Sequence, residues 1–121
     1  MFNGFDAASL SNPDRPTVVT QWGCWNTYYV NPNEESMGHR FMMEGNRGAV
    51  SVMGAVTLTS AANERLLAHL LFERLTQGMP LGNAITEAKK EFVNVSPNSK
   101  DVVLGWTLLG FPELTLQTSG L

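Results

Sequence analysis

The sequence has little of several residue types on which common functions depend. Its 121 residues include one cysteine, Cys24, and two histidines, His39 and His69. One thiol cannot form an internal disulfide or a Cys-X-X-Cys redox pair. Structural zinc takes four ligands at close spacing, and three soft ligands spread along the chain do not fit that pattern. We therefore expect no metal and no cofactor.

Charge and long apolar runs are also scarce. Charged residues make up 16% of the chain, the formal net charge is −3, and no block of basic residues occurs. This argues against nucleic acid and membrane surfaces as partners. The longest nearly unbroken apolar run, over 102–111, is well short of the ~20 residues that span a bilayer, and residues 1–20 show no signal peptide. With 43% hydrophobic residues, the chain can form the core of one domain or of part of one.

Residue patterns along the chain predict an α/β fold. Residues 1–16, which are rich in Asn, Ser, Asp and Pro, predict an irregular lead-in. The β-branched segment 17–22 and the small apolar segment 48–55 predict two buried strands, joined by a helix from Ser36 to Gly45. A strand–helix–strand unit of about 40 residues fits a right-handed parallel crossover.

Two more helices and a last apolar region follow. Ser60 can cap the first helix, in which five leucines form one stripe, and Gly78 and Pro80 end it. The second helix is expected from about Pro80 to Phe92. After a polar turn come the apolar segment VVLGWTLLGFP and a short alternating strand over 113–117. This order of strands and helices predicts a mainly parallel sheet.

Cys24 is the first candidate for chemistry. Ligands of an open parallel sheet bind beyond the carboxyl ends of its strands, and Cys24 ends the first predicted strand. The loop after it, 25–35, is longer than most connections from a strand to a helix. One interpretation is a nucleophilic thiolate above the sheet, and the other is a buried, inert cysteine that packs as a small hydrophobe. Nearby aromatic residues could form the walls of a substrate pocket: Trp22, Trp25, Tyr28 and Tyr29.

His39 is the second candidate. It lies in the first turn of the predicted crossover helix, which begins at the sheet edge where Cys24 lies, so it could approach the thiol as a base. The alternative is a solvated histidine at a helix start. His69 lies beside the leucine stripe and is given no role. Glu34 and Glu35 are adjacent and do not face one another across a site, which argues against a paired acid and base.

Several segments, in their order and spacing, carry a family resemblance. They are Thr17–Cys24, GNRGAVSVMGAV at 45–56, the leucine-rich helix, GMPLGNAITEAKKEF at 78–92 and GWTLLGFPELTL at 105–116. Over residues 15–117 the chain resembles the C-terminal half of the gingipain-type cysteine peptidase domain of peptidase family C25, which is related to the caspase-like CHAT domains. The resemblance implies a caspase-like three-layer αβα sandwich over 17–117, with 118–121 as a tail.

The resemblance also implies a function for Cys24. It would be the nucleophile of a cysteine endopeptidase acting on a peptide or protein substrate, and its backbone N–H would help to bind the oxyanion. The family's catalytic histidine stands in a His-Gly motif upstream of the cysteine, whereas both histidines here follow Cys24. The chain also has Gly38-His39 and Gly110-Phe111-Pro112 where the family has Gly-Glu and Gly-Asp-Pro. We therefore expect the catalytic histidine to be missing from this chain, with His39 as an alternative base.

Two functions remain open at this point. The chain is either the nucleophile-bearing part of a cysteine peptidase, inactive in isolation, or a non-catalytic caspase-like interaction module of the CHAT type. By resemblance, the first implies an extracellular or cell-surface location and the second a cytoplasmic one. The family's cysteine strand lies in the middle of the sheet, and residues 1–16 supply no neighbour for it. We therefore expect strand 17–22 to be an open edge that pairs with a missing N-terminal half or a second chain.

Overall fold

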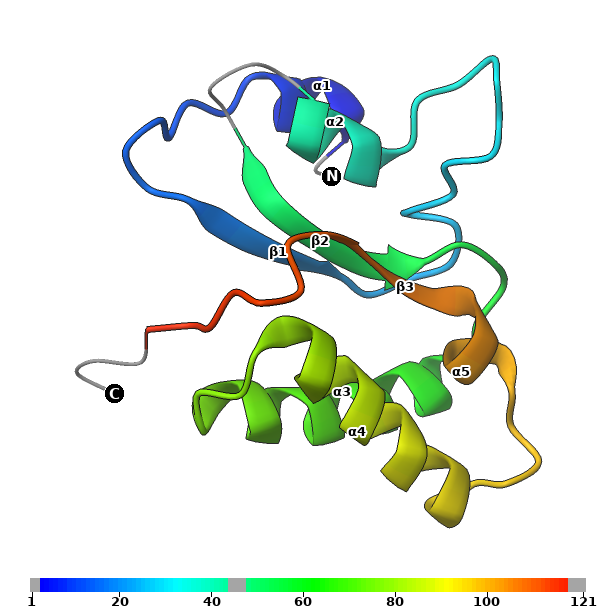
Figure 1. Ribbon diagram of the computed structural model, residues 1–121. Coiled ribbons are helices and arrows are strands. Elements are labelled where there is room, and N and C mark those ends of the chain that lie inside the picture. The colour runs from blue at the N-terminus through cyan, green and yellow to red at the C-terminus, as the bar shows by residue number, and fades with distance from the viewer. Residues whose placement is uncertain (1–2, 44–47, 118–121) are drawn as a thin grey trace.

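The computed structural model describes residues 3–43 and 48–117. In chain order the elements are α1 (Gly4–Ala8), β1 (Thr17–Gln21), α2 (Met37–Met43), β2 (Ala49–Ala55), α3 (Ala61–Thr76), α4 (Leu81–Val95), α5 (Asp101–Gly105) and β3 (Trp106–Gly110). The helices α1 and α2 lie on one face of the sheet, and α3 and α4 lie on the other (Figure 1). The expected three-layer α/β arrangement is confirmed. The predicted helix end at Gly45 lies outside the described residues.

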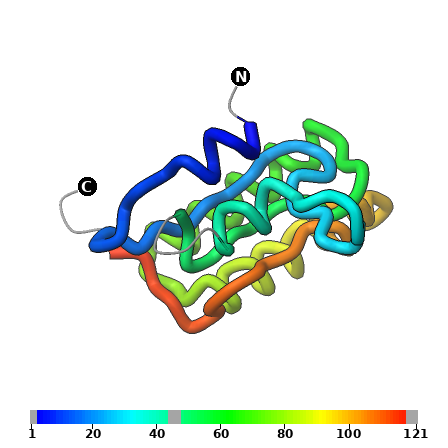
Figure 2. Tube along the Cα trace, turned by 90° about the horizontal axis from the view of Figure 1, so that it is seen from above, coloured from blue at the N-terminus to red at the C-terminus, as the bar shows by residue number. Residues whose placement is uncertain are grey.

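The sheet formed by the described residues has three strands in the order β1-β2-β3. β1 and β2 are parallel, as the strand–helix–strand pattern predicts, whereas β3 is antiparallel to β2, so the sheet is mixed. The helices α3 and α4 pack together as a pair and return the chain to the edge where β2 ends. A strand that starts from this edge must run antiparallel to β2. β1 and β3 lie on opposite sides of β2 (Figure 2), which makes β1 an edge strand in the described part of the chain.

The larger core lies between the sheet and the α3–α4 pair. Burial of a leucine-sized side chain contributes about 1.5–3 kcal/mol, so the leucine stripe of α3 is a main stabilising feature of the fold. Ser60 caps α3 as predicted, because its side chain accepts a hydrogen bond of 3.2 Å from the N–H of Asn63. The core side chains with no more than 1% of their surface exposed include Leu67, Leu71, Leu75, Leu81, Phe92, Val102 and Trp106.

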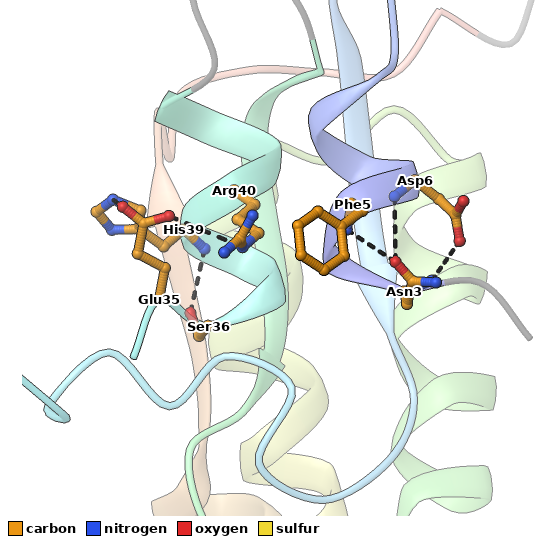
Figure 3. A network of polar contacts seen from close by, with 7 residues as sticks. All are labelled: Asn3, Phe5, Asp6, Glu35, Ser36, His39 and Arg40. Atoms are coloured by element: carbon orange, nitrogen blue, oxygen red, sulfur yellow. Dashed lines mark hydrogen bonds and ion pairs between the residues drawn. The ribbon is translucent and has the colours of Figure 1, made fainter. Parts of the chain in front are cut away.

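The lead-in, predicted to be irregular, contains the short helix α1. Asn3 caps this helix by accepting hydrogen bonds from the N–H groups of Phe5 and Asp6, and the Asp6 carboxylate accepts one from the N–H of Asn3 (Figure 3). This reciprocal capping box satisfies N–H groups that a helix start leaves free. The Arg40 guanidinium of α2 lies 5.3 Å from the centre of the Phe5 ring. A helix of five residues is too short to produce a periodic pattern, which is why the sequence did not indicate it.

The segment 113–117, predicted as a strand, forms no strand in the structure. The carbonyl groups of Pro112 and Leu114 accept hydrogen bonds of 2.9 Å from the first two N–H groups of α4. Pro80 stands at the N-cap of α4 and has no side chain that can accept these N–H groups. The C-terminal segment therefore caps α4 with its backbone instead of extending the sheet, and the third strand lies earlier, at β3.

Candidate active site

Cys24 lies just beyond β1, at the carboxyl edge of the two parallel strands. It is a free, exposed cysteine. Its Sγ lies 3.3 Å from both the backbone N and the carbonyl O of Thr59, and 3.6 Å from Thr59 Oγ1. Thr59 directly precedes Ser60, the cap of α3, so the sulfur lies against the start of this helix. This is the position of a surface thiol and not of a buried packing residue.

The start of α3 is in turn anchored by Asp101 from α5. Asp101 Oδ2 accepts a hydrogen bond of 2.7 Å from the N–H of Ser60, and Oδ1 accepts one of 2.8 Å from the Asn63 side chain. Desolvation opposes the ionisation of Asp101, but hydrogen bonds from the N–H groups of Ser60 and Val102 and from Asn63 outweigh it, so its pKa is lowered. A carboxylate at this position also complements the positive end of the helix.

The backbone on both sides of Cys24 has positive φ. Gly23 has φ 145° and Trp25 has φ 64°, a left-handed conformation that residues with side chains rarely adopt. In Trp25 this conformation costs of order 1–3 kcal/mol and persists only where other contacts hold it. The N–H of Trp25 donates to the carbonyl of Thr57 at 3.3 Å, and the N–H of Thr27 donates to the last residue of β2 at 3.0 Å. The end of β2 thereby holds the turn that presents the thiol.

The N–H groups around the thiol differ in their availability. The N–H of Gly23 donates to Glu64 Oε1 at 3.1 Å, and that of Trp25 is bonded to Thr57. Within residues 3–43 and 48–117, the N–H of Cys24 itself has no protein acceptor. An unbonded N–H is free to donate to a further acceptor. The oxyanion role expected of this group stays a prediction.

The aromatic residues expected as pocket walls divide between core and surface. Trp22 packs against the core, with its ring stacked on Trp106 at a centroid distance of 4.1 Å. Trp25 is 46% exposed and contacts the Tyr28 ring edge to face at 4.9 Å. Tyr29 is exposed to solvent. An open hollow of about 210 Å³ is lined by Trp25, Tyr28, Asn31, Glu34, Glu35 and Ser36.

His39 lies in the first turn of α2, as predicted, and its polar partners come from the residues just before it. Its Nε2 lies 3.7 Å from Glu35 Oε1, and its backbone N–H donates to Ser36 Oγ at 3.1 Å (Figure 3). No hydrogen bond or ion pair joins His39 to Cys24 in the part of the chain that the structure describes. His69 is exposed on α3. Among residues 3–43 and 48–117, the structure therefore brings Cys24 together with Thr59, and no base of these ranges forms a hydrogen bond with its sulfur.

Two residues of the site were not found by sequence reasoning, Thr59 and Glu64. The Glu64 side chain is buried, and its Oε1 accepts hydrogen bonds from the N–H of Gly23 and from the hydroxyl of Thr59. A glutamate in the first turn of a helix is an ordinary start signal. Nothing in the sequence links it to a loop 41 positions earlier, so only the fold reveals this contact.

The described residues contain no group of three His, Cys, Asp or Glu side chains that could hold a metal ion. Among the helices described, none combines the length and the apolar character that a membrane span needs.

An α/β domain with an exposed cysteine at the carboxyl edge of parallel strands has the arrangement of a cysteine-peptidase-related domain. Comparison with known proteins specifies the family, because the model of peptidase family C25 matches residues 1–117. The chain belongs to peptidase family C25, as the resemblance implies.

A solved structure has the same fold. The chain is similar to the crystal structure of the Arg specific cysteine proteinase gingipain R, with a TM-score of 0.75 and 14% sequence identity. The match covers 97% of this chain and 29% of that chain, so this chain spans less than a third of the gingipain R structure. No curated protein matches the chain. The expected gingipain-type fold is confirmed, and none of these matches concerns CHAT domains.

Proposed function

We propose that this chain is the nucleophile-bearing part of a gingipain-like cysteine endopeptidase. The supporting observation is the exposed thiol of Cys24 at the carboxyl edge of β1 and β2 in a chain of family C25. In this reaction Sγ bonds to the carbonyl carbon of the scissile peptide, and the N–H of Cys24 stabilises the oxyanion that forms. A base takes the thiol proton as Sγ attacks and returns it to the amine as the C–N bond breaks. Water then hydrolyses the thioester to a carboxylic acid and the free thiol.

The base in this proposal is a histidine on a segment that pairs with β1. Because β1 is an edge strand within the described residues, its outer backbone groups are open to another strand. A parallel strand added there would end at the same edge of the sheet as β1, beside Cys24. His39 is the alternative base, and its ring would have to leave Glu35 to reach the sulfur.

The hollow lined in part by Trp25, the residue after Cys24, is the proposed site for a substrate side chain. Tyr28, Glu34 and Glu35 also line this hollow, and the Glu35 carboxylate pairs with Arg40 at 3.8 Å. Aromatic faces and carboxylates both attract positive charge. The proposal therefore includes a preference for a basic side chain near the scissile bond.

Alkylation of the single thiol tests the proposed function. Because Cys24 is the only cysteine, iodoacetamide uptake measured by mass spectrometry reports on this residue alone, and Cys24→Ser is the blank. We expect the native chain to react within about tenfold of the rate of the chain unfolded in urea, since the sulfur is exposed. A thiol that reacts only after unfolding would contradict the proposal and favour a non-catalytic interaction module.

A further inference from the structure

We propose that Glu64 is a positioning residue for the Cys24 thiol, a role that rests on the proposed function. Glu64 lies in the first turn of α3, and only 8% of its surface is exposed. One of its oxygens, Oε1, accepts a hydrogen bond of 3.1 Å from the N–H of Gly23 and another from the hydroxyl of Thr59. Gly23 directly precedes the nucleophile, and Thr59 contacts its sulfur. One carboxylate oxygen therefore holds both neighbours of the thiol.

The burial of Glu64 points to the thiol loop as the reason for its position. A carboxylate that leaves water loses hydration, and only good hydrogen bonds offset this loss. No Lys or Arg forms an ion pair with Glu64 among the described residues, and both donors to Oε1 belong to the site. A glutamate that only complemented the positive end of α3 would do so while hydrated at the surface.

The hydrogen bond from Gly23 to Glu64 holds the part of the turn before Cys24, whereas the end of β2 holds the part after it. The Trp25 side is bonded to Thr57, just past β2, whereas the N–H of Gly23 is bonded to Glu64. Because Gly23 has no Cβ and can adopt many backbone conformations, this peptide is free to move once its hydrogen bond is lost. Without Glu64, the peptide before Cys24 loses its acceptor, and Thr59 loses the bond that orients its hydroxyl.

NMR of the full 121-residue chain tests this role in Glu64→Ala. Amide exchange is measured at Gly23, next to the thiol, and at Leu71, in the core of α3, and the Hα–Hβ couplings of Cys24 report its χ1 rotamer. We expect Gly23 exchange to rise about tenfold or more, while Leu71 exchange stays within about twofold of wild type. The Cys24 couplings should change from those of one rotamer to an average over several.

Variants of the neighbouring residues separate positioning from helix stability. Thr59→Val removes the hydroxyl that Glu64 binds and should average the Cys24 couplings, whereas Thr59→Ser keeps it and should preserve the single rotamer. The control, Ser60→Ala, removes the cap hydrogen bond of the same helix start and should leave Gly23 exchange and the Cys24 couplings unchanged. Unchanged couplings in Glu64→Ala, or averaged couplings in Ser60→Ala, would overturn the proposal. If the thiol is not alkylated in the native chain but Glu64→Ala has the expected effects, the proposed peptidase function is contradicted, while the role of Glu64 in positioning Cys24 is confirmed.

Discussion

Replacement of Gly54 by alanine should disrupt the turn that carries Cys24. Gly54 lies in β2, and a Cβ added there would be 2.2 Å from Oγ1 of Thr27, a distance that real Cβ atoms do not show. Thr27 is fully buried, and its hydroxyl donates to Gln21 Oε1 at 3.1 Å. The N–H of Thr27 donates to the carbonyl oxygen of Ala55, the last residue of β2. The added methyl group must therefore displace Thr27 and, with it, the turn.

The expected loss of stability follows from these contacts. Overpacking of a filled site costs about 1–3 kcal/mol, and loss of the hydrogen bond between Thr27 and Gln21 adds about 1 kcal/mol. Gly54→Ala should therefore lower the free energy of unfolding by about 2–4 kcal/mol. Thr27→Ala alone should lower it by about 1–2 kcal/mol, through the lost hydrogen bond and a small loss of buried surface. In the double variant the Oγ1 of Thr27 is absent, so the added methyl group meets no clash there. The loss of unfolding free energy should therefore be smaller than the sum of the two single losses by about 1 kcal/mol or more.

Urea unfolding followed by tryptophan fluorescence measures these free energies, at one fixed chain concentration because association shifts the midpoint. Gly78→Ala is the matched control. Gly78 has φ 81°, and no atom lies within 4 Å of an added Cβ. The stability loss of Gly78→Ala therefore comes from backbone strain alone, and it should add to the loss caused by Thr27→Ala. Additive losses for Gly54→Ala and Thr27→Ala would falsify the steric argument.

The isolated chain should have no peptidase activity, because no base contacts Cys24 in its described part. Turnover of fluorogenic Arg or Lys peptides that Cys24→Ala abolishes would contradict this and make His39→Ala the next test. Light scattering at micromolar concentration should detect dimers or larger species, since β1 presents an open edge, and a stable monomer that unfolds cooperatively would be the contrary result. The lowered pKa of Asp101 means that its carboxylate stabilises the fold above about pH 4, and that this effect is lost as the pH falls through the lowered value. Asp101→Asn should therefore be less stable than wild type at neutral pH and equal to it in strong acid, and a gap that persists in acid would refute this assignment.

Elements with a continuous local pattern were predictable from the sequence. The β-branched run produced β1, and the leucine stripe with its Ser60 cap produced α3, because strand and helix propensities act over neighbouring residues. The segment 113–117 alternates like a strand, yet the carbonyl groups of this region cap α4, whose N-cap Pro80 has no side-chain acceptor. That competition lies between segments far apart in the chain, and a local pattern carries no information about it.

The sequence by itself determined that the chain has a single thiol, that this thiol follows a β-branched strand, and that the strand begins an α/β unit of peptidase family C25. The burial expected of that strand is wrong, because in the described part of the chain β1 lies at the sheet edge and only Gln21 in it is buried. Only the tertiary structure decided that β3 runs antiparallel, since the packing of α3 on α4 sets the edge from which it starts. Only the tertiary structure, too, placed Thr59 on the sulfur and Glu64 on the N–H of Gly23, across 41 positions of sequence. Propensity is a property of neighbouring residues, whereas such contacts exist only after α3 has packed at the carboxyl edge of the sheet.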